Sequence, residues 1–180
     1  MVCEGETEQQ YFKQWERILK GKANFKILPN VGVPLTLVQT AISFRKQLVS
    51  EGTKASNLKT WCVGDLDDHP NVLKALDLAR RKSVEFALSI PCLELWFYLH
   101  FKDQRSHIHR DDITRRSIAE LGIKTKNNLT SMALERLIKE TDQAIVRADF
   151  LENMHLGNGS GHLENPRSGI YRLVRELKSL

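Results

Sequence analysis

Short apolar runs alternate with amphipathic segments over the first hundred residues, and this alternation constrains the fold more than any other feature of the sequence. Runs rich in β-branched and aromatic residues predict strands, and they span residues 1–3, 25–29, 58–63 and 84–90. Apolar residues spaced by three and four predict helices, and these follow the strands over residues 7–20, 34–52, 72–82 and 91–101. Such alternation is typical of a parallel sheet with right-handed crossovers. The sequence therefore predicts an α/β fold, with a mostly parallel sheet flanked by helices.

The pattern changes after residue 100, where helices are expected without strands between them. One helix is predicted to begin at Asp111 and another to cover residues 131–150. The Gly-, Asn- and His-rich segment 152–165 is predicted to be a loop, and a closing helix follows it. We therefore expect an α/β core over residues 1–100 and a mainly helical extension over residues 101–180, packed together as one globular unit.

Composition limits the classes of protein to which the chain can belong. The 180 residues carry a net charge of +5 and a sequence pI of about 9.2, which is compatible with nucleic-acid binding but does not establish it. The three cysteines form no Cys-x-x-Cys pair, so neither a disulfide framework nor a zinc ribbon is indicated. Each lies in an apolar run and is predicted to be a buried thiol, as in a reducing cytoplasm. No apolar segment approaches 18 residues, so we expect no membrane contact and no signal peptide.

An acidic stretch follows the third predicted strand, with Asp65, Asp67, Asp68 and His69 within five residues. Alternation along a strand sends Asp65 and Asp67 to the same side, roughly 6–7 Å apart at their Cα atoms. Two neighbouring carboxylates repel each other unless a cation lies between them, and Mg²⁺ or Mn²⁺ would serve. The alternative is an Asp-rich strand-to-helix turn in which Asp68 caps the next helix.

Further carboxylates follow the other strands. Glu4 would end a first strand that is unusually short or trimmed, and Glu8 lies in the first turn of the following helix. Glu94 lies in the first turn after the fourth strand. Ligands collect at the carboxyl ends of parallel strands, so these residues are candidates for one site. Glu4 could equally belong to a solvated acidic turn, and Glu94 could accept backbone N–H groups at its own helix start.

Basic residues at two places could contact phosphate. Arg80, Arg81 and Lys82 end the third helix, where cations also complement the helix dipole. Lys124 and Lys126 lie in a polar loop, for which a solvated loop is the alternative interpretation.

Three histidines, His100, His107 and His109, gather around the polar segment that follows the fourth helix. No Cys or Glu lies at a spacing that would complete a zinc site with them. They are therefore predicted to be exposed to solvent.

Four separated segments resemble the RloB family, which comprises small proteins associated with restriction–modification and phage-defence loci. The resemblance covers essentially the whole chain, and its more specific motifs are Asp-Leu-Asp-Asp-His-Pro and Pro-Cys-Leu-Glu-Leu-Trp. The segments that carry it are Cys3 to Phe12, Asp65 to Pro70, Pro91 to Trp96 and Asn165 to Val174.

The resemblance implies a Toprim-like fold, shared with topoisomerases, primases and OLD-type nucleases. It assigns catalytic and metal-binding roles to Glu4, Asp65 and Asp67. We expect Asp68 to be a further metal ligand. Supporting roles would fall to Glu8, His69 and Glu94. It also implies a separately encoded ATPase of the ABC or OLD type as a partner.

We therefore expect a Mg²⁺- or Mn²⁺-dependent nuclease that serves as a cytoplasmic antiviral effector, of the toxin type that causes abortive infection. RNA, including tRNA, is expected before DNA, by analogy with Toprim toxins. One alternative is a non-catalytic sensor subunit that docks on the ATPase, and another is an enzyme that transfers phosphoryl groups on a nucleotide. A homo-oligomer is compatible with each.

Overall fold

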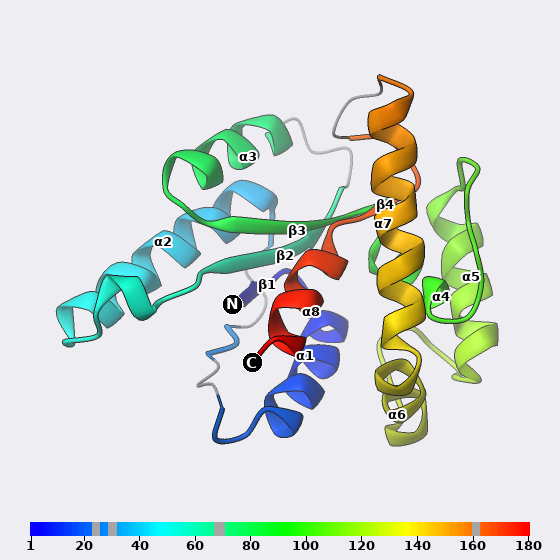
Figure 1. Ribbon diagram of the computed structural model, residues 1–180, viewed down its shortest axis with the longest axis horizontal. Helices are drawn as coiled ribbons and strands as arrows, with labels where there is room; N and C mark the ends of the chain where they lie inside the picture. The colour runs from blue at the N-terminus through cyan, green and yellow to red at the C-terminus, as the bar shows by residue number, and fades with distance from the viewer. Residues whose placement is uncertain (23–25, 29–31, 67–70, 160–162) are drawn as a thin grey trace.

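The computed structural model describes residues 1–22, 26–28, 32–66, 71–159 and 163–180. In these ranges a sheet with the order β1-β2-β3-β4 forms the centre of the molecule (Figure 1). The strands β1 (Val2–Cys3), β2 (Trp61–Asp65) and β3 (Glu85–Ile90) are parallel. The short strand β4 (Arg167–Ser168) pairs with β3 in the antiparallel direction. The prediction of a mostly parallel α/β sheet is thus confirmed.

Helices surround this sheet (Figure 1). They are α1 (Glu6–Ile18), α2 (Pro34–Ser50), α3 (Val72–Arg81), α4 (Leu93–Leu99), α5 (Arg110–Leu121), α6 (Ser131–Lys139), α7 (Thr141–Gly157) and α8 (Ile170–Lys178), with a short 3₁₀ turn at Ala55–Asn57. Within the described ranges, no helix combines the length and the apolar character that crossing a membrane would need.

Helices cover both faces of the sheet, and side chains alternate between the two faces along each strand. Val2, Cys62 and Phe86 face α2 and α3 and pack with Leu37 and Ala75. Cys3, Val63 and Ala87 point the other way, into a larger core formed with α1 and with α4 to α8. The three cysteine thiols are free and buried, as the apolar runs around them predict.

The larger core has an aromatic centre. Tyr11 and Phe12 of α1 are fully buried against Phe97 of α4, with Tyr11 and Phe97 ring centroids 5.5 Å apart. His100 at the end of α4 is also buried, and its Nδ1 lies 2.8 Å from the carbonyl oxygen of Trp96. Burial lowers the pKa of His100 to about 3. The prediction that His100 is exposed is therefore wrong, because His100 belongs to the end of the apolar helix α4, where its ring packs against Tyr11 and Trp96.

The second predicted strand, over residues 25–29, is reduced to one bridge in its described part. Leu28 pairs with Val2 in the parallel direction. Its N–H donates to the carbonyl of Met1 at 3.1 Å, and its carbonyl accepts from Cys3 N–H at 3.2 Å. The neighbouring strand β1 has only two residues, so little backbone is available for a longer ladder.

The single helix predicted over residues 131–150 is wrong, because α6 ends and α7 begins around Glu140. The Thr141 hydroxyl donates to the carbonyl of Leu137 at 2.9 Å, and the Glu140 carbonyl accepts the first bonds of α7. Apolar spacing continues across this break and cannot reveal it. The loop predicted over residues 152–165 also begins late, since α7 continues to Gly157.

The C-terminal segment joins the sheet through β4, which the sequence pattern does not predict because two residues show no alternation. Arg167 pairs with Ile90, and Ser168 with Ser89. The Arg167 guanidinium forms an ion pair with Glu152 of α7, with side-chain exposures of 9% and 14%. The segment after residue 100 therefore contributes both a strand and a buried ion pair to the core.

Replacing Arg167 with methionine should destabilise the protein by about 3–5 kcal/mol, because it leaves the Glu152 carboxylate buried without its cation. Lys178→Met offers a matched control, since the Lys178–Asp142 pair is exposed and its loss should cost about 1 kcal/mol or less. Urea unfolding of the two variants measures the difference. Equal losses would contradict the role of Arg167 in the core.

Candidate functional site

A cleft of about 370 Å³ lies at the carboxyl edge of the parallel strands. Its wall combines the turn after β1, the end of β2, the start of α4, the start of α5 and the loop between α5 and α6. The residues that line it are Glu4, Gly5, Glu6, Thr7, Glu8, Asp65, Leu93, Glu94, Arg110, Lys126 and Asn127. Carboxylates that are far apart in the sequence meet here because parallel strands end at one edge.

Glu4 is bound to the neighbouring strand through both its backbone and its side chain. Its backbone N–H donates to the carbonyl of Val63 at 3.0 Å. Its carboxylate Oε2 accepts a hydrogen bond from the backbone N–H of Asp65, also at 3.0 Å. The side chain therefore lies across β2 and brings its charge beside Asp65.

Asp65 is almost completely enclosed, with 14% of its side chain exposed. Its Oδ2 accepts a hydrogen bond from Arg110 Nη2 at 3.1 Å. Its Oδ1 is buried and has no hydrogen-bond partner among the described residues. Burial raises the pKa of Asp65 well above its usual value, Glu8 and Glu94 raise it further, and Arg110 opposes the shift.

Glu8 is 6% exposed, and its carboxylate folds back over Gly5. Burial raises the pKa of Glu8 to about 7. A backbone hydrogen bond opposes this shift, Glu4 and Glu94 increase it, and Lys126 opposes it. Glu8 is thus a carboxyl group that can exchange a proton near neutral pH.

Glu94 faces the cleft from the first turn of α4 and is 4% exposed. Its Oε1 lies 3.8 Å from Lys126 Nζ. Lys126 reaches this position because its loop is fastened to α1. The Gln10 side chain donates to the carbonyl of Asn127 at 2.8 Å and accepts from Leu129 N–H at 3.0 Å.

Asp67, Asp68 and His69 lie outside the described residues. Lys124 is exposed in the loop that carries Lys126. Arg80, Arg81 and Lys82 end α3 next to the amino end of β3, at the edge of the sheet opposite the cleft. The structure thus brings Lys126 to the carboxylates but leaves the basic run of α3 elsewhere, where Arg80 and Arg81 pair with Asp77.

Arg110 is a cleft residue that the sequence pattern does not reveal as one. It begins α5, and its Nη2 also donates to the carbonyl of Pro91 at 3.3 Å. A cation at a helix N-terminus is unfavourable to the helix dipole. That unfavourable position is the available signal that Arg110 serves something other than its own helix.

Two anchors fix the segment that leads into Arg110. The Asn165 side chain accepts from Ile108 N–H at 3.2 Å and donates to the carbonyl of Ile108 at 2.9 Å. Arg147 of α7 caps the end of α4 by donating to the carbonyls of Leu99 and His100 at 2.7 and 3.0 Å. The path of the chain from α4 to α5 is therefore held from two sides.

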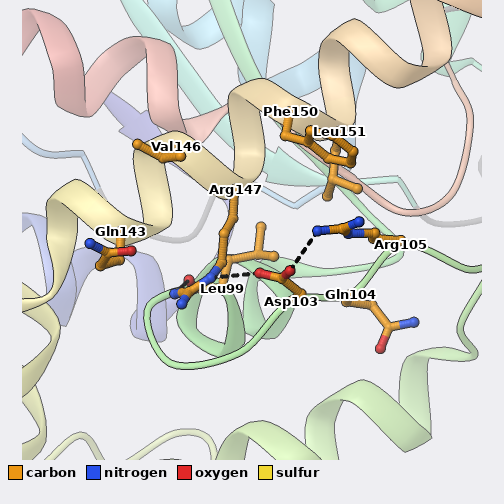
Figure 2. A pocket seen from close by; sticks show the side chains of 9 residues that line it. All are labelled: Leu99, Asp103, Gln104, Arg105, Gln143, Val146, Arg147, Phe150 and Leu151. Carbon is orange, nitrogen blue, oxygen red and sulfur yellow. Dashed lines mark hydrogen bonds and ion pairs between the residues drawn. The ribbon is translucent and has the colours of Figure 1, made fainter.

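A second cavity, of about 250 Å³, lies between this segment and α7 (Figure 2). Asp103 lies between Arg147 and Arg105, at 2.8 and 2.9 Å, and the Arg105 guanidinium lies 4.6 Å from the centroid of the Phe150 ring. The carboxylate of Asp103 is thus occupied by two guanidinium groups. The described residues that line this cavity include no group of acids like that in the first cleft. The contacts of Asp103 with Arg147 and Arg105 join this segment to α7.

The cleft suits a divalent cation in its chemistry. The buried Asp65 Oδ1 lacks a partner among the described residues, and burial together with the neighbouring carboxyl groups raises the pKa values of Asp65 and Glu8. A hard cation with oxygen ligands would relieve both conditions. The described residues alone contain no group of three acidic, histidine or cysteine side chains close enough to hold an ion, and Asp67 and Asp68 fall outside them.

Comparison with known proteins assigns the family. The model of the RloB-like protein family matches residues 1–177. The chain belongs to the RloB-like family. No curated protein and no solved structure matches it. The acidic cleft is therefore a feature of an RloB-like chain, found at the strand ends where its Glu4 and Asp65 motifs meet.

The raised pKa of Glu8 predicts how stability depends on pH. The folded protein favours the protonated form of Glu8. The contribution of Glu8 to the free energy of unfolding is therefore complete below its usual pKa of 4.5 and is lost as the pH rises through about 7. Without divalent ions, the wild-type free energy of unfolding should fall by up to about 3 kcal/mol over this range. The neutral variant Glu8→Gln should lose the part of this fall that Glu8 causes, while the raised pKa of Asp65 leaves a remainder. Urea unfolding at several pH values measures it.

Glu135→Gln provides the control, because Glu135 is an exposed carboxylate on α6. This variant should keep the wild-type dependence on pH. The same dependence in Glu8→Gln as in wild type would contradict the assignment.

Proposed function

We propose that this RloB-like chain is a Mg²⁺- or Mn²⁺-dependent phosphodiesterase that acts on nucleic acid. The supporting observation is the convergence of Glu4, Glu8, Asp65 and Glu94 in one cleft that also contains Arg110 and Lys126. Buried acids beside cations provide both parts of a phosphodiester site, since the acids can hold metal ions and the cations can bind phosphate.

A Toprim-like identity of the fold is part of this proposal. Glu4 follows β1 and Asp65 ends β2, and these two strands are parallel neighbours. A glutamate after the first strand and an Asp-x-Asp pair after a later strand is the arrangement that the family resemblance implies. The hydrogen bond between Glu4 and the Asp65 backbone supports a shared centre.

Glu4 and Asp65 would hold the ion, with Asp67 and Asp68 as further ligands. The bound ion would supply Lewis-acid polarisation of the phosphodiester. Glu8, whose pKa is about 7, would accept or deliver the proton. Glu94 would support the centre from the side of α4, and His69 would do so from the acidic motif.

Arg110 and Lys126 would bind the phosphate. Arg110 offers a planar guanidinium, of which one nitrogen already contacts Asp65. Lys126 is 43% exposed and lies 3.8 Å from Glu94, so its ammonium can reach a ligand in the cleft. Together they place positive charge on two sides of the carboxylates.

The biological setting that we propose is antiphage defence, as the family resemblance implies, with an ABC- or OLD-type ATPase as the partner. RNA, including tRNA, comes before DNA by analogy. Exposed apolar side chains favour the second candidate, a docking subunit without catalysis. Val146 and Phe150 of α7 are 64% and 45% exposed and would suit a protein partner.

Cleavage of labelled RNA and DNA during a Mn²⁺ and Mg²⁺ titration tests the proposal. Wild type should cleave RNA, DNA or both, and this cleavage should require a divalent ion. Asp65→Asn, Asp67→Asn and Glu4→Gln should each lower the rate by about 100-fold or more, because each neutralises a proposed ligand. Glu135→Gln should cleave like wild type.

No divalent-dependent cleavage of either substrate, with or without the partner ATPase, would contradict the nuclease and favour the docking subunit. Cleavage by the Asp65→Asn variant at the wild-type rate would show that the activity belongs to another site.

Lys126→Gln should weaken nucleic-acid binding and reduce the slope of log affinity against log salt by about one, because one phosphate contact is lost. Lys82→Gln removes an equal charge at the opposite edge of the sheet and should change neither. Fluorescence anisotropy at several salt concentrations measures both variants. A larger effect of Lys82→Gln than of Lys126→Gln would indicate that nucleic acid binds at the end of α3.

A further inference from the structure

We propose that Gly64 is a positioning residue of the carboxylate site, and that its missing side chain fixes the place of the Glu4 carboxylate. This inference rests on the proposed function for its catalytic meaning. Its structural part, the contact between Gly64 and Glu4, can be tested whether or not the protein is a nuclease.

The space above Gly64 is occupied by the carboxylate of Glu4. A Cβ atom added to Gly64 would lie 2.5 Å from Glu4 Oε2, well inside any normal contact distance. The other nearby atoms, Glu4 Cβ and Leu37 Cδ2, would both be 3.6 Å away, which is ordinary van der Waals contact. The Glu4 carboxylate is therefore the group with which a larger residue would collide.

The glycine is not needed for its backbone freedom. Gly64 lies within β2 and pairs with Leu88 of β3 in regular parallel register. It also does not belong to the glycines with positive φ, so alanine fits the backbone. The colliding atom is the end of a flexible side chain, which can move at little cost to the fold.

The consequence falls on the site. The Glu4 backbone is held by the Val63 carbonyl, and the Glu4 carboxylate is held by the Asp65 N–H. These two bonds set the distance between the acids of β1 and β2. A methyl group on Gly64 would push the carboxylate off the Asp65 amide and change that distance. Ligands displaced in this way bind metal more weakly, typically by about 10–100-fold.

Gly5 has a corresponding relation to a different acid. A Cβ atom on Gly5 would lie 2.8 Å from Glu8 Oε2. Each of the two glycines thus leaves space for a different carboxylate, Gly64 for Glu4 and Gly5 for Glu8. Gly157, at the end of α7, has no atom within 4 Å of its added Cβ and supplies the neutral control.

The experiment compares wild type, Gly64→Ala, Gly157→Ala, Glu4→Ala and the double variant Glu4→Ala/Gly64→Ala. Mn²⁺ affinity is measured by electron paramagnetic resonance of free Mn²⁺. Exchange of the Asp65 amide proton is followed by ¹H–¹⁵N NMR, and urea unfolding measures stability. We expect Gly64→Ala to bind Mn²⁺ about 10-fold or more weakly, with faster Asp65 exchange and nearly unchanged stability.

The double variant should bind Mn²⁺ no more weakly than Glu4→Ala, because Gly64 acts only through Glu4. Additive losses would overturn the proposal, and so would wild-type Asp65 exchange in Gly64→Ala. If Gly64→Ala does not fold, the Glu4→Ala variant tests whether the Glu4 carboxylate holds the Asp65 amide. Exchange of the Asp65 amide proton at the wild-type rate in Glu4→Ala overturns the proposal. If wild type binds no Mn²⁺, the proposed function fails, while the exchange data still judge the positioning role.

Discussion

The burial of several carboxyl groups together at the carboxyl edge of the sheet is the constraint on which the site depends. Asp65, Glu8 and Glu94 lie in one cleft, where burial and then the neighbouring carboxylates raise the pKa values of Asp65 and Glu8. A buried charge without a partner is costly. The fold offsets part of this cost by bringing the cations Arg110 and Lys126 to the acids.

These cations come from the C-terminal half of the chain, so the helical part completes the cleft. Arg110 begins α5, and the Asn165 side chain holds the backbone just before it. Lys126 lies in a loop that Gln10 of α1 fastens to the first helix. The asparagine of the Asn-Pro motif near the C-terminus thus has a structural role, because it holds the backbone that leads to Arg110.

The strand-end rule makes Glu4, Asp65 and Glu94 candidates for one site, with alternatives left open for Glu4 and Glu94. The structure places all three in the cleft. The same rule gives no information about side chains on loops or at helix starts. For this reason it does not predict that Arg110, at the start of α5, lies in the cleft. The assignment of Arg81 rests on composition alone, and the structure places that residue at the other edge of the sheet. The break at Glu140 cannot be seen in the sequence because both helices bury apolar residues with continuous spacing.

The sequence by itself determined the α/β class, the family and the acids at the predicted strand ends, because apolar periodicity and short motifs are formed by neighbours in the chain. Only the tertiary structure decided which cations face those acids and where the Glu4 carboxylate lies. It also placed the Glu4 carboxylate over Gly64, in the space that a side chain at that position would occupy. These are contacts between segments separated by tens of residues, and their distances depend on how helices and loops pack against the sheet. No local pattern encodes that packing.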